Sequence, residues 1–174
     1  MSQFQEDLAA AKPAERLVRQ TLSKLTSEYE FVDVADDPQY YDYGDILAIG
    51  KNGSKVFFEV KNDSRIAETK NILCEDEVYD KRNDRYTKGN MHSNYDYYCV
   101  VSEAENRVYI LDFKVLRQIY KKGEFRIFNH PTQYTEGYLL PLYLAKRYKA
   151  LIAQIDYKND EVKIFWDKTQ KTAC

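Results

Sequence analysis

Three charged side chains stand among sheet-forming residues in the stretch YGDILAIGKNGSKVFFEVKND, which covers residues 43–63. Asp45 precedes a short apolar run, and Glu59 and Lys61 interrupt a second one. Two carboxylates that are brought together repel each other unless a cation lies between them, and a divalent metal with oxygen ligands is the usual reason to accept that cost. A lysine beside such a metal could orient or deprotonate a water molecule, or offset the charge that builds up on a phosphate.

A hairpin would bring these residues together. The pair Asn52-Gly53 separates the two apolar runs and is a strong signal for a tight antiparallel turn. Side chains alternate between the faces of a strand, so Glu59 and Lys61 share one face, and antiparallel pairing can place Asp45 close to Glu59. The alternative is that Glu59 and Lys61 form the solvated face of an edge strand and that Asp45 only opens a strand.

Glu15 is a third candidate carboxylate. It falls on the apolar stripe of an expected helix, at spacings of three, seven and ten residues from Val18, Leu22 and Leu25. A residue on that stripe points inward or along the rim of the helix contact, not to open solvent. An inward carboxylate needs a partner, and a metal ion is one candidate.

The surrounding sequence predicts a single α/β (α+β) layer architecture, with a central mixed sheet of about five strands flanked by helices. The expected helices cover residues 14–25 with Pro13 at their start, 65–82 with Ser64 as the cap, 114–122, and 140–155 beginning near Pro141. The expected strands cover residues 29–34, 45–49, 55–61, 95–102, 107–113, 125–128 and 161–166.

The order of charged residues and elements resembles the PD-(D/E)xK nuclease superfamily, the restriction-endonuclease-like group that includes phage and mobile-element nucleases. The match consists of Asp45, thirteen intervening residues and the sequence Glu59-Val60-Lys61 on the second strand of a hairpin, followed by further core elements. One departure from the family's short signature is Gly44, which stands where that signature has proline. The agreement of hairpin, flanking apolar runs and first-helix carboxylate strengthens a short motif.

The resemblance implies a restriction-endonuclease-like core over about residues 13–112 and a C-terminal extension over residues 113–174, within one domain that covers residues 1–174. It implies a metal-dependent endonuclease that hydrolyses phosphodiester bonds in DNA with a water bound to Mg²⁺, Mn²⁺ being an alternative ion. Carried over by position, the catalytic residues are Asp45, Glu59, Lys61 and Glu15. The implied metal ligands are Asp45, Glu59, Glu15 and the backbone carbonyl of Val60.

The partner implied by the resemblance is duplex or branched DNA. The residues themselves do not select DNA over RNA. Cutting both strands of a duplex requires two sites, so we expect a homodimer, with the apolar C-terminal helix as one candidate surface. The alternative is a catalytically inactive nuclease-like module that binds nucleic acid or protein, or a subunit that depends on a partner protein for targeting.

Two basic segments are candidates for nucleic-acid contact. The segment KRNDRYTKGNMHSN is expected to be a polar loop, and the residues in it that could grip phosphates or stack on a base are Lys81, Arg82, Arg85, Tyr86 and Lys88. The second segment is the expected third helix, with Lys114, Arg117, Lys121 and Lys122. The alternative for both segments is an ordinary solvated surface.

Composition restricts the function classes. The formal net charge of -2 argues against a protein that coats nucleic acid by charge alone, because such affinity comes from neutralising phosphates with Lys and Arg. The three cysteines show no spacing typical of a zinc site, and we expect free thiols. The sequence has no apolar run of membrane-spanning length and no signal-peptide pattern at its N-terminus, which predicts a cytoplasmic protein without membrane association.

Overall fold

The computed structural model describes residues 3–80, 83–122, 126–130 and 135–166. Its α-helices are α1 (Gln3–Leu25), α2 (Ile66–Thr69), α3 (Phe113–Lys121) and α4 (Leu142–Arg147), and its short 3₁₀ turns are η1 (Pro38–Tyr40) and η2 (Asn90–His92). Its strands are β1 (Tyr29–Asp33), β2 (Ile46–Gly50), β3 (Lys55–Asn62), β4 (Asn71–Asp80), β5 (Arg85–Lys88), β6 (Tyr97–Ser102), β7 (Arg107–Asp112), β8 (Arg126–His130), β9 (Thr135–Pro141), β10 (Leu151–Asp156) and β11 (Glu161–Ile164).

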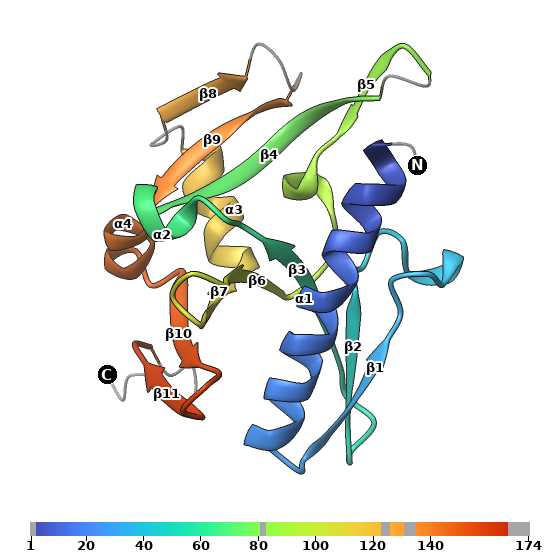
Figure 1. The fold of residues 1–174 in the computed structure, drawn as a ribbon, viewed down its shortest axis with the longest axis vertical. Helices are drawn as coiled ribbons and strands as arrows, with labels where there is room; N and C mark the ends of the chain where they lie inside the picture. The colour runs from blue at the N-terminus through green and yellow to red at the C-terminus, as the bar shows by residue number, and fades with distance from the viewer. Residues whose placement is uncertain (1–2, 81–82, 123–125, 131–134, 167–174) are drawn as a thin grey trace.

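A seven-stranded sheet lies at the centre, in the order β1-β2-β3-β6-β7-β10-β11 (Figure 1). Its neighbouring strands are antiparallel except β3 and β6, which are parallel, so the sheet is mixed. A second sheet of four strands, β5-β4-β9-β8, lies beside it. The expected α+β architecture with a central mixed sheet and flanking helices is therefore confirmed, with more strands than the sequence indicated.

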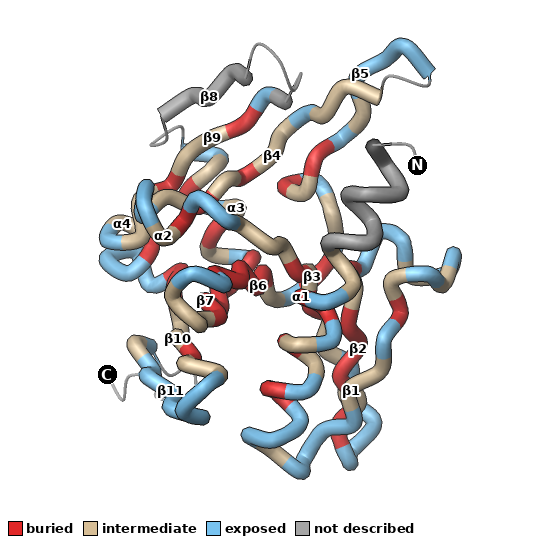
Figure 2. The backbone as a smooth tube through the Cα atoms, in the orientation of Figure 1, coloured by how far each residue is buried: buried red, intermediate tan, exposed pale blue. Residues whose placement is uncertain are grey.

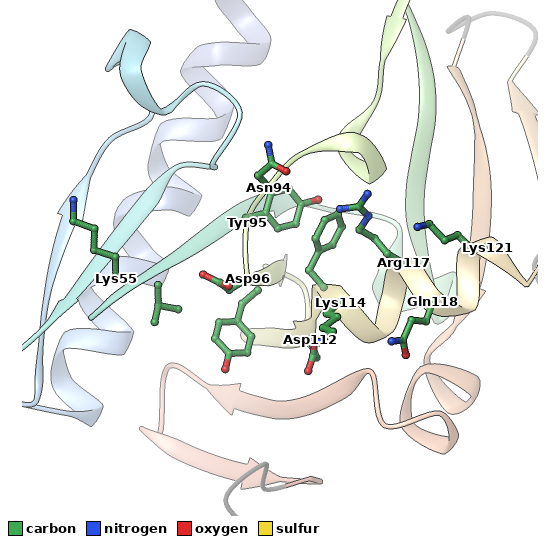
Figure 3. A pocket seen from close by; sticks show the side chains of 12 residues that line it. Lys55, Asn94, Tyr95, Asp96, Asp112, Lys114, Arg117, Gln118 and Lys121 are labelled. Atoms are coloured by element: carbon green, nitrogen blue, oxygen red, sulfur yellow. The ribbon is translucent and has the colours of Figure 1, made fainter. Parts of the chain in front are cut away.

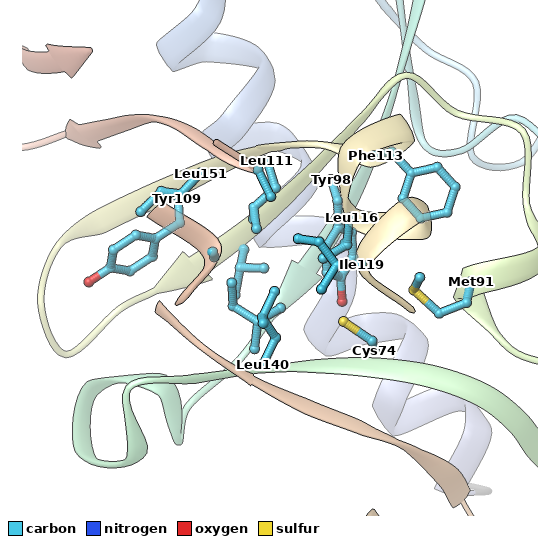
Figure 4. Packing of buried hydrophobic residues seen from close by; sticks show 14 of the residues in the cluster. Cys74, Met91, Tyr98, Tyr109, Leu111, Phe113, Leu116, Ile119, Leu140 and Leu151 are labelled. Carbon is cyan, nitrogen blue, oxygen red and sulfur yellow. The ribbon is translucent and has the colours of Figure 1, made fainter. Parts of the chain in front are cut away.

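Each face of the central sheet carries its own buried core, and the buried backbone gathers along the inner strands (Figure 2). On one face, α1 packs its Ala14, Val18 and Leu22 against Phe58 and Val60 of β3. Side chains of α3, β4 and β9 cover the other face. That second cluster includes Leu111, Phe113, Leu116, Ile119, Leu140 and Cys74 (Figure 4). The alternation expected for β3 is present, because Phe57 packs against the second cluster and its neighbours Val56 and Phe58 pack against the first.

The prediction of a long helix over residues 65–82 is wrong. Of its described residues, 65–80, only α2 is helical, and it ends at Thr69, where the C-cap Lys70 has a φ of +53°. Ser64 does not cap it, because Oδ1 of Asp63 accepts hydrogen bonds from the backbone N–H groups of Arg65 and Ile66 at 2.9 and 3.1 Å. The apolar residues of this segment thus do not form one helical stripe.

The rest of that segment forms β4, which pairs with both β5 and β9. Ile72 and Cys74 alternate along it and are both fully buried in the second core. Pairing with β9 supplies backbone hydrogen bonds to this segment from a partner 57 to 70 positions away, and this tertiary contact overrides the helical spacing. Strand β9 itself was not foreseen.

Two further boundaries differ from expectation. Helix α1 begins at Gln3, and Pro13 lies inside it instead of at its start. The C-terminal helix expected over residues 140–155 is limited to α4, after which Lys149 has a φ of +62° and the chain continues as β10. Because residues 151–156 form β10, which pairs with β7 and β11 in the central sheet, the long apolar helix proposed as a dimer surface does not exist.

Cys74 and Cys99 are buried free thiols, as expected, and Cys174 lies outside the described residues. In the part of the chain that the structure describes, no helix combines the length and the apolar character that crossing a bilayer requires.

Candidate active site

The β2–β3 hairpin brings Asp45 to Glu59. The paired register begins with Ile46 opposite Phe58, and Asp45 and Glu59 are the next residues of the two segments, near enough for the charge of Asp45 to act on Glu59. The backbone N–H of Asp45 donates to the carbonyl of Phe58 at 2.8 Å, and the N–H of Val60 donates to Oδ2 of Asp45, also at 2.8 Å. These two hydrogen bonds fix the position of the Asp45 carboxylate at the end of the hairpin.

Gly44 explains how the chain enters this position. Its φ is +106°, a value that proline cannot adopt because its ring holds φ near −65°. A Cβ atom at this residue would lie 2.6 Å from the carbonyl oxygen of Phe58, too close for any side chain. The local backbone therefore requires the glycine that stands where the family signature has proline.

Glu15 of α1 is buried, with 5% of its surface exposed, beside Ala14 and Val18 of the first core. Its Oε2 atom accepts no hydrogen bond from any residue that the structure describes, and Nζ of Lys12 lies 3.4 Å from it. Burial raises the pKa of Glu15, and the charge of Lys12 opposes that rise. A buried carboxylate oxygen without a hydrogen bond is a costly arrangement that a cation would relieve.

The carboxylates raise one another's pKa. Burial, and then the charge of Asp45, raise the pKa of Glu59 to about 8, while Lys61 opposes the rise. Burial raises the pKa of Asp45 to about 6, the Val60 N–H lowers it, and the charge of Glu15 raises it further. Glu15, Asp45 and Glu59 therefore lie within electrostatic range of one another, in a setting that disfavours three negative charges at once.

Glu75 is a fourth carboxylate of the site, and the sequence analysis missed it. It lies on β4, where its Oε2 is 3.5 Å from Nζ of Lys61, and its charge also raises the pKa of Glu59. It was missed because its segment was assigned to a helix. The alternation of Ile72 and Cys74 in the sequence was the available sign that Glu75 lies on a strand.

The donor set fits a hard divalent cation in its chemistry, since carboxylate and carbonyl oxygens are the ligands that Mg²⁺ prefers. The Oε2 of Glu15, which has an ion pair with Lys12 but no hydrogen bond from the described residues, and the raised pKa values of Asp45 and Glu59 are the observations that favour a cation here. Within the described residues, however, no group of three or more His, Cys, Asp or Glu side chains is already arranged to hold a metal ion. The site is thus compatible with a metal by donor type and is not preformed for one.

The residues expected in a nucleic-acid-binding loop lie elsewhere. Lys81 and Arg82 fall outside the described residues. Arg85, Tyr86 and Lys88 lie on β5, a strand instead of the expected loop, in the hairpin that extends from the second sheet (Figure 1). The Tyr86 ring is half exposed and contacts the Tyr79 ring edge-on, with the centroids 5.3 Å apart.

The charge around this hairpin is mixed. The strand register sets Arg85 opposite Asp80 and Lys88 opposite Glu77. Acidic residues therefore face both basic residues across the strand pair, which reduces the attraction of the hairpin for phosphate.

No protein-family model matches the chain, and no curated protein matches it. Among solved structures, it is similar to the bacterial homing endonuclease I-Ssp6803I, with a TM-score of 0.43 and 14% sequence identity over 62% of this chain and 70% of that one. A likeness at this level concerns the fold alone and says nothing about activity.

Proposed function

We propose that the protein is a divalent-cation-dependent nuclease that hydrolyses phosphodiester bonds in DNA. The observation that supports this proposal is the gathering of Glu15, Asp45 and Glu59 beside Lys61, with the pKa of Glu59 raised to about 8. A group of carboxylates of which Glu15 is buried and Asp45 and Glu59 are partly buried, all with raised pKa values, is typical of a site that binds a cation. Duplex or branched DNA is the substrate that the sequence resemblance suggests.

Each residue has a role in this proposal. Asp45, Glu59, Glu15 and the carbonyl of Val60 would hold Mg²⁺, or Mn²⁺ in its place, which when bound would neutralise the charge that develops on the scissile phosphate. Lys61 would hold the attacking water or stabilise the phosphate through its ammonium group. Glu75 lies 3.5 Å from that ammonium and would orient it.

One observation favours a second candidate, a nuclease-like module that binds without cutting. Asp45 directs Oδ2 to the Val60 N–H, and no described group of acidic, histidine or cysteine side chains is set to hold a metal. In such a module the raised carboxylate pKa values would be a remnant without catalytic use, and targeting would depend on a partner protein.

A cleavage assay separates the two candidates. We would incubate the protein with supercoiled plasmid, linear duplex, RNA and a four-way junction, each with Mg²⁺, with Mn²⁺ or with EDTA. We expect cleavage that requires the divalent ion and that Asp45→Asn, Glu59→Gln and Lys61→Ala reduce by about 10² or more. Glu28→Gln is the matched control, because Glu28 is an exposed carboxylate paired with Lys51.

The same variants also separate loss of metal from loss of chemistry. Asp45→Asn should abolish divalent-ion binding in calorimetry, whereas Lys61→Ala should retain it, because an ammonium group is not a ligand. The enzyme proposal fails if the folded protein cuts none of the four substrates with either ion and binds no divalent ion through Asp45.

A double-strand break would require two such sites, and we propose a homodimer for that case. Analytical ultracentrifugation with and without DNA tests it directly. If only nicked plasmid forms and the protein remains monomeric, one site acts alone on one strand.

A further inference from the structure

A groove of about 570 Å³ lies between the start of β3 and helix α3. Lys55 lies on the β3 side, and Lys114, Arg117 and Lys121 lie on the α3 side, with the segment 94–97 between them (Figure 3). The groove is separate from the β4–β5 hairpin, which carries the first basic segment indicated by the sequence, and it includes three of the four basic residues of the second, the third helix.

The cations of this groove are aligned by the helix. Lys114, Arg117 and Lys121 are spaced by three and four residues, which puts them on one face of α3. The opposite face is buried in the second core through Phe113, Leu116 and Ile119. The cationic face is therefore held outward by the same packing that fixes the helix.

The acidic residues of the groove offset only part of its positive charge. Four cationic side chains face two carboxylates, Asp96 and Asp112, although the chain as a whole has a formal charge of -2. Oδ2 of Asp96 accepts from the backbone N–H of Phe57 at 2.9 Å, and Oδ1 of Asp112 accepts from that of Val115 at 3.2 Å. Across the residues that the structure describes, no ion pair engages Lys55 or the three cations of α3.

An aromatic surface leads from the groove to the carboxylates. Lys55, Phe57 and Glu59 follow one another on the same face of β3. The rings of Tyr43 and Tyr40 lie 5.0 and 5.8 Å from the Phe57 ring, centroid to centroid, and Tyr43 is 40% exposed. Unpaired bases stack on exposed aromatic rings of this kind, while phosphates require cations.

We propose that the groove formed by Lys55, Lys114, Arg117 and Lys121 binds a phosphodiester strand and leads it past Tyr43 and Phe57 to the carboxylates. This inference rests on the proposed nuclease function, since it identifies the surface that holds the substrate of that site. The ligand chemistry is a chain of phosphates. It is supplied either by an unpaired strand or by one strand of a duplex.

The test compares two double variants with the same change of charge. The groove variant is Lys114→Gln/Arg117→Gln. The control variant is Arg147→Gln/Lys158→Gln, which removes an exposed arginine on α4 and an exposed lysine in the β10–β11 turn. Binding of fluorescein-labelled single-stranded and duplex DNA is followed by anisotropy at several salt concentrations in EDTA. Because no divalent ion is present, binding is measured whether or not the protein is a nuclease.

We expect the groove variant to bind about tenfold more weakly at low salt, and the control variant to bind like the wild type. The slope of log K against log salt should fall by about 0.9 per lost phosphate contact on a duplex and about 0.7 on a single strand, which distinguishes the two sources. Lys114→Arg/Lys121→Arg should retain the affinity for DNA, because it keeps both positive charges. That result would show that the affinity depends on the charge and not on a change of fold. Circular dichroism and thermal melting verify that each variant is folded.

Three outcomes overturn the inference. The groove variant could bind with unchanged affinity and slope, the control variant could lose as much as the groove variant, or oligo-glutamate of equal charge could bind as tightly as DNA with the same salt response. The last result would assign the groove to an acidic peptide. Cleavage that persists in a groove variant with normal binding would overturn this inference and leave the proposed function intact.

Discussion

At the scale of residues, the site consists of acidic groups whose burial and mutual repulsion oppose folding. Glu15, Asp45 and Glu59 each have a pKa raised chiefly by burial. Burying a carboxylate costs stability unless it is paired or neutralised, so the cluster weakens the fold. A cost of this kind at one place is typical of a functional site.

The pH dependence of stability should reveal Glu59. Its pKa is about 8 in the folded protein against an ordinary 4.5, so in that interval the unfolded chain has released a proton that the folded chain retains. The free energy of unfolding should therefore fall as pH rises from about 4.5 to about 8. Glu59→Gln cannot ionise and should be more stable than the wild type at pH 8 by roughly 1–3 kcal/mol.

Urea denaturation at several pH values measures this effect. The control is Glu28→Gln, because the Glu28 carboxylate is exposed beside Lys51. This variant should keep the wild-type dependence of the unfolding free energy on pH. An identical pH dependence for Glu59→Gln and wild type would show that Glu59 ionises normally.

Mg²⁺ should stabilise the folded protein through the same residues. A ligand at ten times its Kd adds about 1.4 kcal/mol, which corresponds to a rise in Tm of about 3–5 °C for a chain of this size. Differential scanning calorimetry with MgCl₂ against NaCl of equal ionic strength measures the rise. Asp45→Asn should lose it, and an equal rise in that variant would place the ion elsewhere.

At the scale of elements, the β2–β3 hairpin and β4 position the site together. The hairpin supplies Asp45 from the entry to β2 and Glu59 and Lys61 from β3, and β4 brings Glu75 to Lys61. The positive φ of Gly44 directs the chain into β2 beside the carbonyl of Phe58. The hairpin therefore depends on a glycine at its entry as well as on its turn.

Two glycines of this hairpin make a matched pair for mutation. Gly44→Ala should lower the free energy of unfolding by roughly 2–4 kcal/mol, because it combines a positive φ with a Cβ atom 2.6 Å from the Phe58 carbonyl oxygen. Gly53→Ala should cost only about 1 kcal/mol, because Gly53 also has a positive φ but its Cβ atom would meet nothing within 4 Å. Equal losses in urea denaturation would mean that the close approach at Gly44 is easily relaxed.

At the scale of the whole molecule, one sheet separates two cores. Leu22 belongs to the core beneath α1 and Leu116 to the core beneath α3, and strand β3 contributes side chains to both. Because the two cores share the sheet, we expect them to unfold as one unit and the chain to behave as a single domain.

Leucine truncation on each face tests this expectation. Leu22→Ala and Leu116→Ala should each destabilise the protein by roughly 2–5 kcal/mol, whereas Leu25→Ala, at a residue that is 39% exposed, should cost about 1 kcal/mol or less. Fluorescence of the single tryptophan, Trp166, and far-UV circular dichroism should report the same midpoint in every variant. Separate midpoints would show two domains.

The sequence by itself determined the local features of this protein. Alternation in residues 55–61 and the pair Asn52-Gly53 are set by neighbouring residues, and they were enough to predict the hairpin and the proximity of Asp45 to Glu59. Helical spacing predicted that Glu15 points inward, because an amphipathic stripe also depends only on nearby positions, and Glu15 is buried. Helix α3 and the mixed sheet followed from similar local signals.

The tertiary structure decided what depends on distant partners. Residues 71–80 have a spacing compatible with a helix, and they form a strand because β9 pairs with them and Ile72 and Cys74 enter the core. Strand pairing also places Glu75 beside Lys61 and makes residues 151–156 a strand. The partner strands lie outside any short window of sequence, so local patterns could not indicate these pairings. The raised pKa values have the same origin, since burial and the approach of carboxylates from α1, β3 and the entry to β2 exist only once these elements are packed.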